Sequence, residues 1–169
     1  MSMDSLKDLY VEQLRDLYSA ENQILKALPM MAERAHNPEL RTAFQEHERV
    51  THDQVKRLEA IFDGLGETPG GHHCKGMEGL LKEGQEMLRE KGDPDTIDAG
   101  LIAAAQRVEH YEIAGYGCVR TYADRLGMSD HAHTLQQTLD EEGDTDHRLT
   151  ALAESIINPG AEQGEGGYR

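Results

Sequence analysis

Two glutamates stand in a stretch of the sequence whose other residues are suited to burial. The segment VEHYEIAGYG, residues 108–117, places Glu109 and Glu112 three positions apart, one turn before Tyr116. On a helical wheel of about 100° per residue, both glutamates lie on the apolar face. Burying an ionised carboxylate costs several kcal/mol unless a hydrogen bond or a cation compensates it. The pair therefore indicates a site that needs protons or cations.

Three other stretches with helical periodicity also turn polar side chains toward their apolar faces. These inward residues are, in chain order, Glu21, then His47, Thr51 and Gln54, and finally Glu142 and Asp146. Glu48 and His52 have the four-residue spacing of a metal-binding pair, but they fall at the flank of the apolar face or outside it. The inward ionisable set is thus five carboxylates and one imidazole.

Turn-forming residues divide the chain into the elements that must position this set. Long helices are predicted over residues 4–35, 38–64, 95–126 and 129–157, with a shorter amphipathic helix over 74–90. Short connections make each pair of long helices an antiparallel hairpin, and a crossover of about thirty residues joins the two hairpins. We therefore predict an all-α fold in one domain, residues 1–157: a four-helix bundle with one long crossover. Residues 158–169 lack periodicity and are expected to be a disordered tail.

The depth of the carboxylates can be compared along the second hairpin. Glu112 and Glu142 each lie fifteen residues from Gly127 in the turn, and Glu109 and Asp146 lie eighteen and nineteen residues from it. At about 1.5 Å of rise per residue, these four groups meet at one level.

The first hairpin matches less well. Glu21 is level with about residue 53, and His47 lies about two turns away from that level. Either His47 or Gln54 therefore completes the site from this helix.

Composition limits the classes of partner. The net charge of −15 argues against nucleic acid and anionic membranes as partners. No apolar run approaches the length of a membrane span, and the first residues do not resemble a signal peptide. Two cysteines, Cys74 and Cys118, cannot build a disulfide framework. We expect a cytoplasmic protein.

Cations are the simplest way to make five converging carboxylates tolerable. Two divalent ions would supply +4 against −5, which nearly balances the site. Hard oxygen ligands with one imidazole suit iron or manganese better than zinc or copper. The alternative is a network of protonated, hydrogen-bonded acids without metal.

The segments LYSAENQILKALPMMA (17–32), QVKRLEAIF (54–62), VEHYEIAGYG (108–117) and TLDEEGDTDHRLTALAES (138–155) resemble the YciE/YciF family of ferritin-like proteins. This resemblance runs from about residue 4 to residue 157 and includes MEGLLKEG (77–84) in the crossover. It implies a rubrerythrin-type bundle, generally a homodimer, associated with bacterial stress responses. It implies as metal ligands Glu21, His47, Glu109, Glu112, Glu142 and Asp146.

The resemblance leaves the activity open. The leading expectation is a site for two metal ions per chain, iron with manganese as the alternative, that oxidises Fe(II) or consumes peroxide or O₂. The competing expectation is a non-catalytic dimeric scaffold, whose carboxylates hold a structural ion or no ion. Whether the protein is an enzyme is not decided by the sequence.

Overall fold

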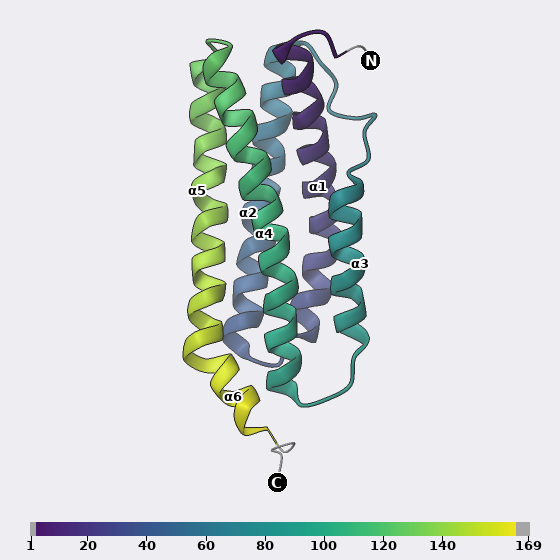
Figure 1. Cartoon of the computed structure of the whole chain (residues 1–169), viewed down its shortest axis with the longest axis vertical. Helices are drawn as coiled ribbons and strands as arrows, with labels where there is room; N and C mark the ends of the chain where they lie inside the picture. The colour runs from purple at the N-terminus through teal and green to yellow at the C-terminus, as the bar shows by residue number, and fades with distance from the viewer. Residues whose placement is uncertain (1–2, 165–169) are drawn as a thin grey trace.

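The protein is a rod of parallel and antiparallel helices. The computed structural model describes residues 3–164, and these contain helices and no strand (Figure 1). The long helices are α1 (Leu6–Arg34), α2 (Pro38–Leu65), α4 (Pro94–Arg125) and α5 (Ser129–Leu152), and the shorter ones are α3 (Lys75–Arg89) and α6 (Asn158–Gln163). None of the described helices is apolar over a length that could cross a membrane.

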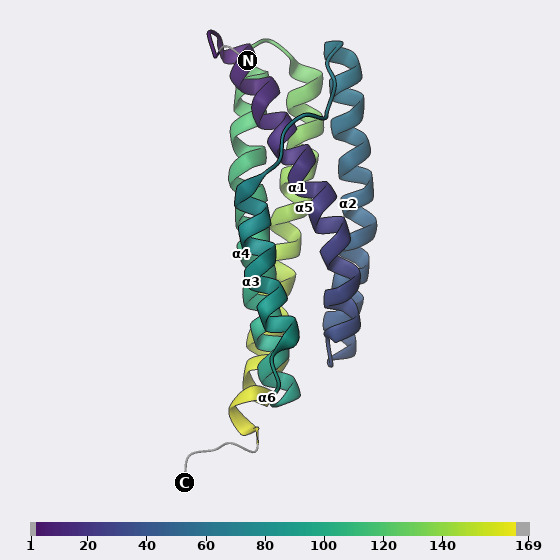
Figure 2. The ribbon, with the colours of Figure 1, turned by 90° about the vertical axis from the view of Figure 1, so that its right-hand side faces the viewer.

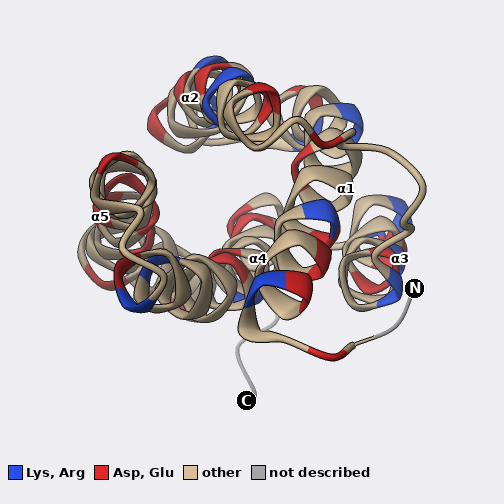
Figure 3. Ribbon diagram, turned by 90° about the horizontal axis from the view of Figure 1, so that it is seen from above, with Lys and Arg blue, Asp and Glu red and all other residues tan. Residues whose placement is uncertain are grey.

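The four long helices form two antiparallel hairpins, α1–α2 and α4–α5. The connection between the hairpins carries α3, which packs along α1 and α4 on the outside of the bundle (Figures 1 and 2). Seen from above, α2 and α5 lie on the side away from α3 (Figure 3). The predicted all-α bundle with a helical crossover is confirmed.

Polar caps define where the helices begin. Pro38 is the first residue of α2, and the side chain of Asn37 before it accepts hydrogen bonds from the backbone N–H groups of Glu39 and Leu40. The same turn is held from α4, where the two oxygens of Asp98 accept from the backbone N–H groups of His36 and Asn37 at 2.9 and 2.6 Å. Pro at the first helical position costs no hydrogen bond, because that N–H has no partner within a helix.

Two apolar clusters fill the bundle, one toward each end. The upper cluster lies near the α4–α5 turn and includes Tyr10, Leu14, Phe62, Val119 and Leu135. The lower cluster lies near the α1–α2 turn and includes Leu28, Phe44, Leu101, Leu149 and Ile157. Between them, all four long helices contribute buried polar side chains, which we call the polar layer: Glu21, His47, Thr51, Gln54, Glu109, Glu112, Thr138 and Glu142.

The end of the chain differs from the expected tail. After α5, one turn of π-helix (Ala153–Ile157) leads into α6, so residues 158–163 are helical and not disordered. The cause is packing that local periodicity does not show: Ile157 is fully buried in the lower cluster, and Gly160 lies so close to α4 that a Cβ there would be 2.5 Å from Oδ2 of Asp95. The last five residues of the expected tail, 165–169, lie outside the described residues.

Candidate metal centre

Three of the long helices bring four potential metal ligands together in the polar layer. His47 of α2, Glu109 and Glu112 of α4 and Glu142 of α5 each offer one ligand atom, and these atoms all lie within 4.8 Å of one another. We call these four residues the ligand cluster. His47 is 5 % exposed, Glu109 is 1 % exposed, and Glu112 and Glu142 are fully buried. The spacing of Glu109 and Glu112 on one helix face is what places both carboxylates in the bundle.

Almost all of the buried carboxylate oxygens here lack a hydrogen bond. Within the described part of the chain, both oxygens of Glu109, Glu112 and Glu142 are buried without a partner, as is Oε2 of Glu21. Buried polar atoms in folded proteins are nearly always hydrogen-bonded, and an unpaired charged one is especially costly. Such a concentration of unpaired oxygens is typical of a site whose partner is a cation.

His47 approaches two of the carboxylates without satisfying them. Its Nδ1 lies 3.2 Å from Oε1 of Glu109, and its Nε2 lies 3.6 Å from Oε2 of Glu142. Neither Nε2 of His47 nor Oε1 of Glu109 has a hydrogen-bond partner among the described residues. The backbone carbonyl of His47 accepts from the hydroxyl of Thr51 at 2.9 Å. The imidazole therefore faces the carboxylates as a ligand would.

Glu21 reaches the polar layer from α1 but is not one of the four clustered ligands. It is fully buried, and its Oε1 accepts a hydrogen bond from the hydroxyl of Tyr116 on α4. Burial, followed by the charge of Glu142, raises the pKa of Glu21 to about 8. Its second oxygen is free to receive a further partner.

The surroundings also disfavour ionisation of Glu109 and Glu112 on α4. Burial is the largest cause that raises the pKa of Glu109 and of Glu112 well above the usual range, and the charge of Glu142 is the next. Burial likewise raises the pKa of Tyr116, so this phenol keeps its proton and can donate it to Glu21. Without a cation, the polar layer holds several of its carboxyl groups in the neutral form.

Asp146 lies one turn beyond Glu142 on α5, at the edge of the polar layer. Its side chain is 16 % exposed, and its Oδ1 lies 3.2 Å from Nε2 of the exposed His110. The same oxygen accepts a long bond of 3.4 Å from Gln106. The structure thus brings together four of the six predicted ligands, places Glu21 beside them, and turns Asp146 toward the flank.

Gln54, the alternative to His47, is fully buried two turns further along α2. Its Nε2 donates to Oε2 of Glu141 at 3.3 Å, while its Oε1 has no partner among the described residues. Glu141 also forms a two-pronged ion pair with Arg57, at 2.6 and 2.8 Å. No local pattern separates Glu141 from the solvated acidic residues around it, because its partner Arg57 comes from a different helix.

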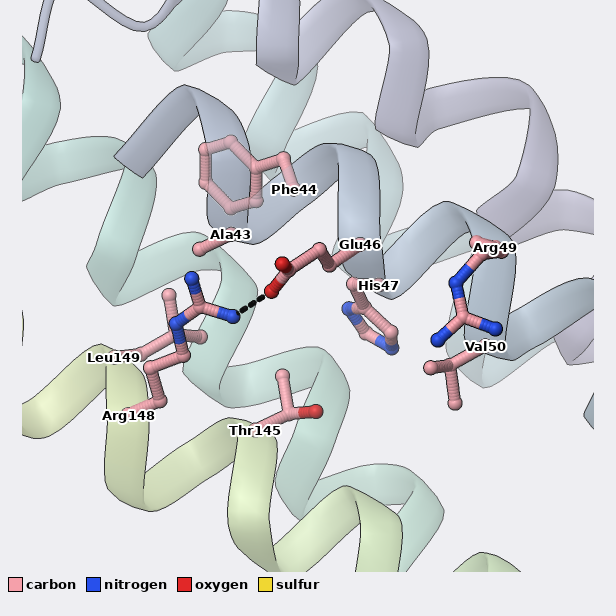
Figure 4. A pocket seen from close by; sticks show the side chains of 9 residues that line it. All are labelled: Ala43, Phe44, Glu46, His47, Arg49, Val50, Thr145, Arg148 and Leu149. Atoms are coloured by element: carbon pink, nitrogen blue, oxygen red, sulfur yellow. Dashed lines mark hydrogen bonds and ion pairs between the residues drawn. The ribbon is translucent and has the colours of Figure 1, made fainter. Parts of the chain in front are cut away.

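A hollow between α2 and α5 reaches His47 from the surface. It has a volume of about 270 Å³ and is lined by Ala43, Phe44, Glu46, His47, Arg49, Val50, Thr145, Arg148 and Leu149 (Figure 4). His47 is the member of the ligand cluster that lines it.

Known proteins share this chain's sequence and fold. Residues 5–162 match the family described as domain of unknown function DUF892. Protein YciF of Escherichia coli K12 is 40 % identical over 163 residues, which cover 96 % of this chain and 98 % of YciF.

Solved structures agree with that match. The crystal structure of the E. coli stress protein YciF superposes with a TM-score of 0.89 at 39 % identity, covering 92 % of this chain and 99 % of that one. YcfI of Rhodopseudomonas palustris superposes with a TM-score of 0.84 at 41 % identity, covering 89 % and 97 %. A Xanthomonas campestris protein, XCC3681, shares the fold at 20 % identity and a TM-score of 0.74, covering 94 % and 97 %. This chain therefore belongs to the DUF892 family, as its resemblance to YciE and YciF predicted.

Proposed function

We propose that this protein is a ferritin-like carboxylate protein that binds two divalent metal ions per chain in the polar layer. The observation that carries the proposal is the set of buried, unpartnered oxygens of Glu21, Glu109, Glu112 and Glu142. With all four carboxylates ionised, two divalent ions balance their charge. His47 supplies an imidazole beside three of them.

The donor set favours iron, with manganese as the alternative. Oxygen donors with a single imidazole, projecting from facing helices, are the ligands of di-iron and di-manganese bundle proteins. We propose His47, Glu109, Glu112 and Glu142 as the central ligands and Glu21 as the ligand from α1. Asp146 stays a predicted ligand that would have to turn inward from the flank.

Bound iron would supply one-electron redox chemistry, so the protein could oxidise Fe(II) or consume peroxide or O₂. The residues of the chain would hold the ions and keep bulk water away, because every carboxylate of the ligand cluster is at most 1 % exposed. Tyr116 would fix the orientation of Glu21 through its hydrogen bond. Since E. coli YciF is described as a stress protein, we place this activity in the bacterial stress response.

Anaerobic titration of the metal-free protein with Fe(II) tests this proposal. We expect two Fe per chain, and we expect the bound Fe(II) to be oxidised when O₂ or H₂O₂ is added. The double variant Glu109→Ala, Glu142→Ala should lose this binding, whereas Glu83→Ala on the exposed face of α3 should keep it. Unchanged Fe(II) binding in the double variant would contradict the proposal.

The alternative is a non-catalytic scaffold whose carboxylates remain protonated or hold a structural ion. It would appear in the same titration as no Fe binding, or as binding without oxidation. A homodimer and a cytoplasmic location also stay predictions. Light scattering of the purified protein checks the first, and cell fractionation checks the second.

A further inference from the structure

The hollow between α2 and α5 leads to His47 from outside the bundle. The ligand cluster itself is closed, because none of its members is more than 5 % exposed. An ion that reaches it must pass side chains that move. The hollow has a volume of about 270 Å³, and a space of that size holds several water molecules. A hydrated ion can therefore approach as far as His47.

Two ion pairs join α2 and α5, and one of them lines this hollow. Arg57 lies two turns beyond the hollow along α2 and holds Glu141 with two short bonds; both side chains are largely covered, at 21 % and 28 % exposure. Arg148 and Glu46 both line the hollow and pair at its rim, and their side chains are 45 % and 53 % exposed (Figure 4). Exposed ion pairs add little to stability, so the rim pair opens at little cost.

We propose that this hollow is the loading route for divalent cations, and that the carboxylate of Glu46 receives the ion when Arg148 releases it. The inference rests on the proposed metal-binding function. Glu46 and His47 both line the hollow, so an ion held by Glu46 shares one space with the imidazole (Figure 4). His47 is in turn 3.2 Å from Glu109 and 3.6 Å from Glu142. The ion passes from one oxygen donor to the next with the imidazole between them.

Arg148 neutralises Glu46 until a cation arrives, and Arg49, the other arginine of the lining, pairs with Asp53 at 3.7 Å. Its guanidinium also lines a second hollow, of about 460 Å³, together with Glu39, Thr42 and Ser155. When a divalent ion takes the carboxylate of Glu46, the guanidinium can turn into this second hollow toward Glu39. The overall charge of −15 raises the concentration of cations near the surface and favours the exchange.

Rates of Co²⁺ uptake by the metal-free protein, followed by stopped-flow absorbance, test the route. Substitutions of the two partners of the ion pair should change the rate of Co²⁺ uptake in opposite directions. Arg148→Gln frees the receiving carboxylate and should speed uptake about three- to tenfold. Glu46→Gln removes the carboxylate and leaves the arginine, so it should slow uptake by a similar factor. An ion pair that only holds α2 against α5 would give changes of the same sign.

A matched pair of threonines on α5 tests the passage itself. Thr145 lines the hollow, whereas Thr134 does not; both are half-buried, and each donates its hydroxyl to the carbonyl oxygen four residues earlier at 3.0 Å. Thr145→Phe should slow uptake at least tenfold with unchanged final occupancy, and Thr134→Phe should not.

These experiments distinguish a failure of the loading route from a failure of the proposed metal binding. If the variants at Glu46, Arg148 and Thr145 take up Co²⁺ at the rate of the unsubstituted protein, the route is overturned and metal binding stands. If the unsubstituted protein takes up no Co²⁺ and no Fe(II), both proposals fall.

Discussion

At the scale of single residues, the polar layer buries carboxyl groups that would carry a charge in water. Glu112 is fully buried, and both of its oxygens lack a partner in the described part of the chain. Burial and the neighbouring carboxylates Glu142 and Glu21 raise its pKa well above the usual range. The residue therefore destabilises the metal-free protein at any pH that would otherwise ionise it. A substitution that keeps the shape of Glu112 and removes its charge should change the stability of the metal-free protein and its metal affinity in opposite directions.

We expect Glu112→Gln to stabilise the metal-free protein and to weaken metal binding. At pH 8 the gain in unfolding free energy should be about 1–3 kcal/mol, the typical cost of a buried polar group without a partner. Urea denaturation in the presence of a chelator measures it, and Fe(II) titration measures the loss of binding. Glu83→Gln, on the exposed side of α3, is the control and should change neither.

The sequence located the carboxylates because a charged residue on an apolar helix face is a strong signal. Equal distance from Gly127 placed Glu112 and Glu142 at one depth, and the structure has both in the ligand cluster. Asp146 lies at a similar depth but outside the ligand cluster, because its side chain points around α5 toward the flank and His110. The sequence did not decide whether His47 or Gln54 completes the site from α2. Which of them meets the carboxylates depends on the stagger between hairpins, and that stagger is set by long-range packing.

At the scale of helices, each element is positioned by contacts that its own sequence does not show. Asp98 is a fully buried carboxylate on α4 whose two oxygens accept backbone N–H groups of the α1–α2 turn. It joins one hairpin to the other at the lower end of the bundle. Its partners are more than sixty residues away in the chain, so no local pattern reveals its role.

Asp98→Ala should destabilise the protein by about 2–4 kcal/mol, because two backbone donors lose a charged acceptor. Asp98→Asn, which retains one acceptor oxygen, should cost about half as much. Thermal or urea unfolding gives the difference. Asp124→Ala, at an exposed position of the same helix, should have little effect, and an equal loss there would contradict the assigned role.

Gly143 weakens α5 next to Glu142. A Cβ at this position would meet nothing within 4 Å, so Gly143→Ala should add about 0.5–1 kcal/mol of stability through helix propensity alone. Gly76→Ala in α3 is the contrasting variant, since its Cβ would lie 2.7 Å from the ring of Tyr111. It should reduce stability. The two unfolding midpoints, measured side by side, distinguish a free glycine from one required by packing.

At the scale of the whole molecule, the all-α bundle and its crossover followed from helix periodicity and connection lengths. What the sequence did not predict is the C-terminal continuation through α6, where burial of Ile157 outweighs weak local signals. Pro159 and Gly160 within α6 are residues that normally end helices.

The stability of the metal-free protein should fall as pH rises from about 4.5 toward 8. Glu21 has a pKa of about 8 in the folded protein, above the ordinary value of 4.5, and those of Glu109 and Glu112 are also raised. The folded state then binds more protons than the unfolded state between these values, so rising pH favours unfolding. Metal should reverse this trend, because ions compete with protons for the same oxygens. Urea midpoints at pH 5 and pH 8, with chelator and with Mn²⁺, measure both effects.

The division of the ligand cluster between two hairpins has a consequence for the lifetime of the protein. His47 belongs to the first hairpin and Glu109, Glu112 and Glu142 to the second. A bound ion would therefore hold distant parts of one chain together in the folded state and would stabilise that state by mass action. Proteases degrade chains that open, so the metal-free form would be cleared first. The amount of this protein in a cell would then follow the supply of its metal without any change in synthesis.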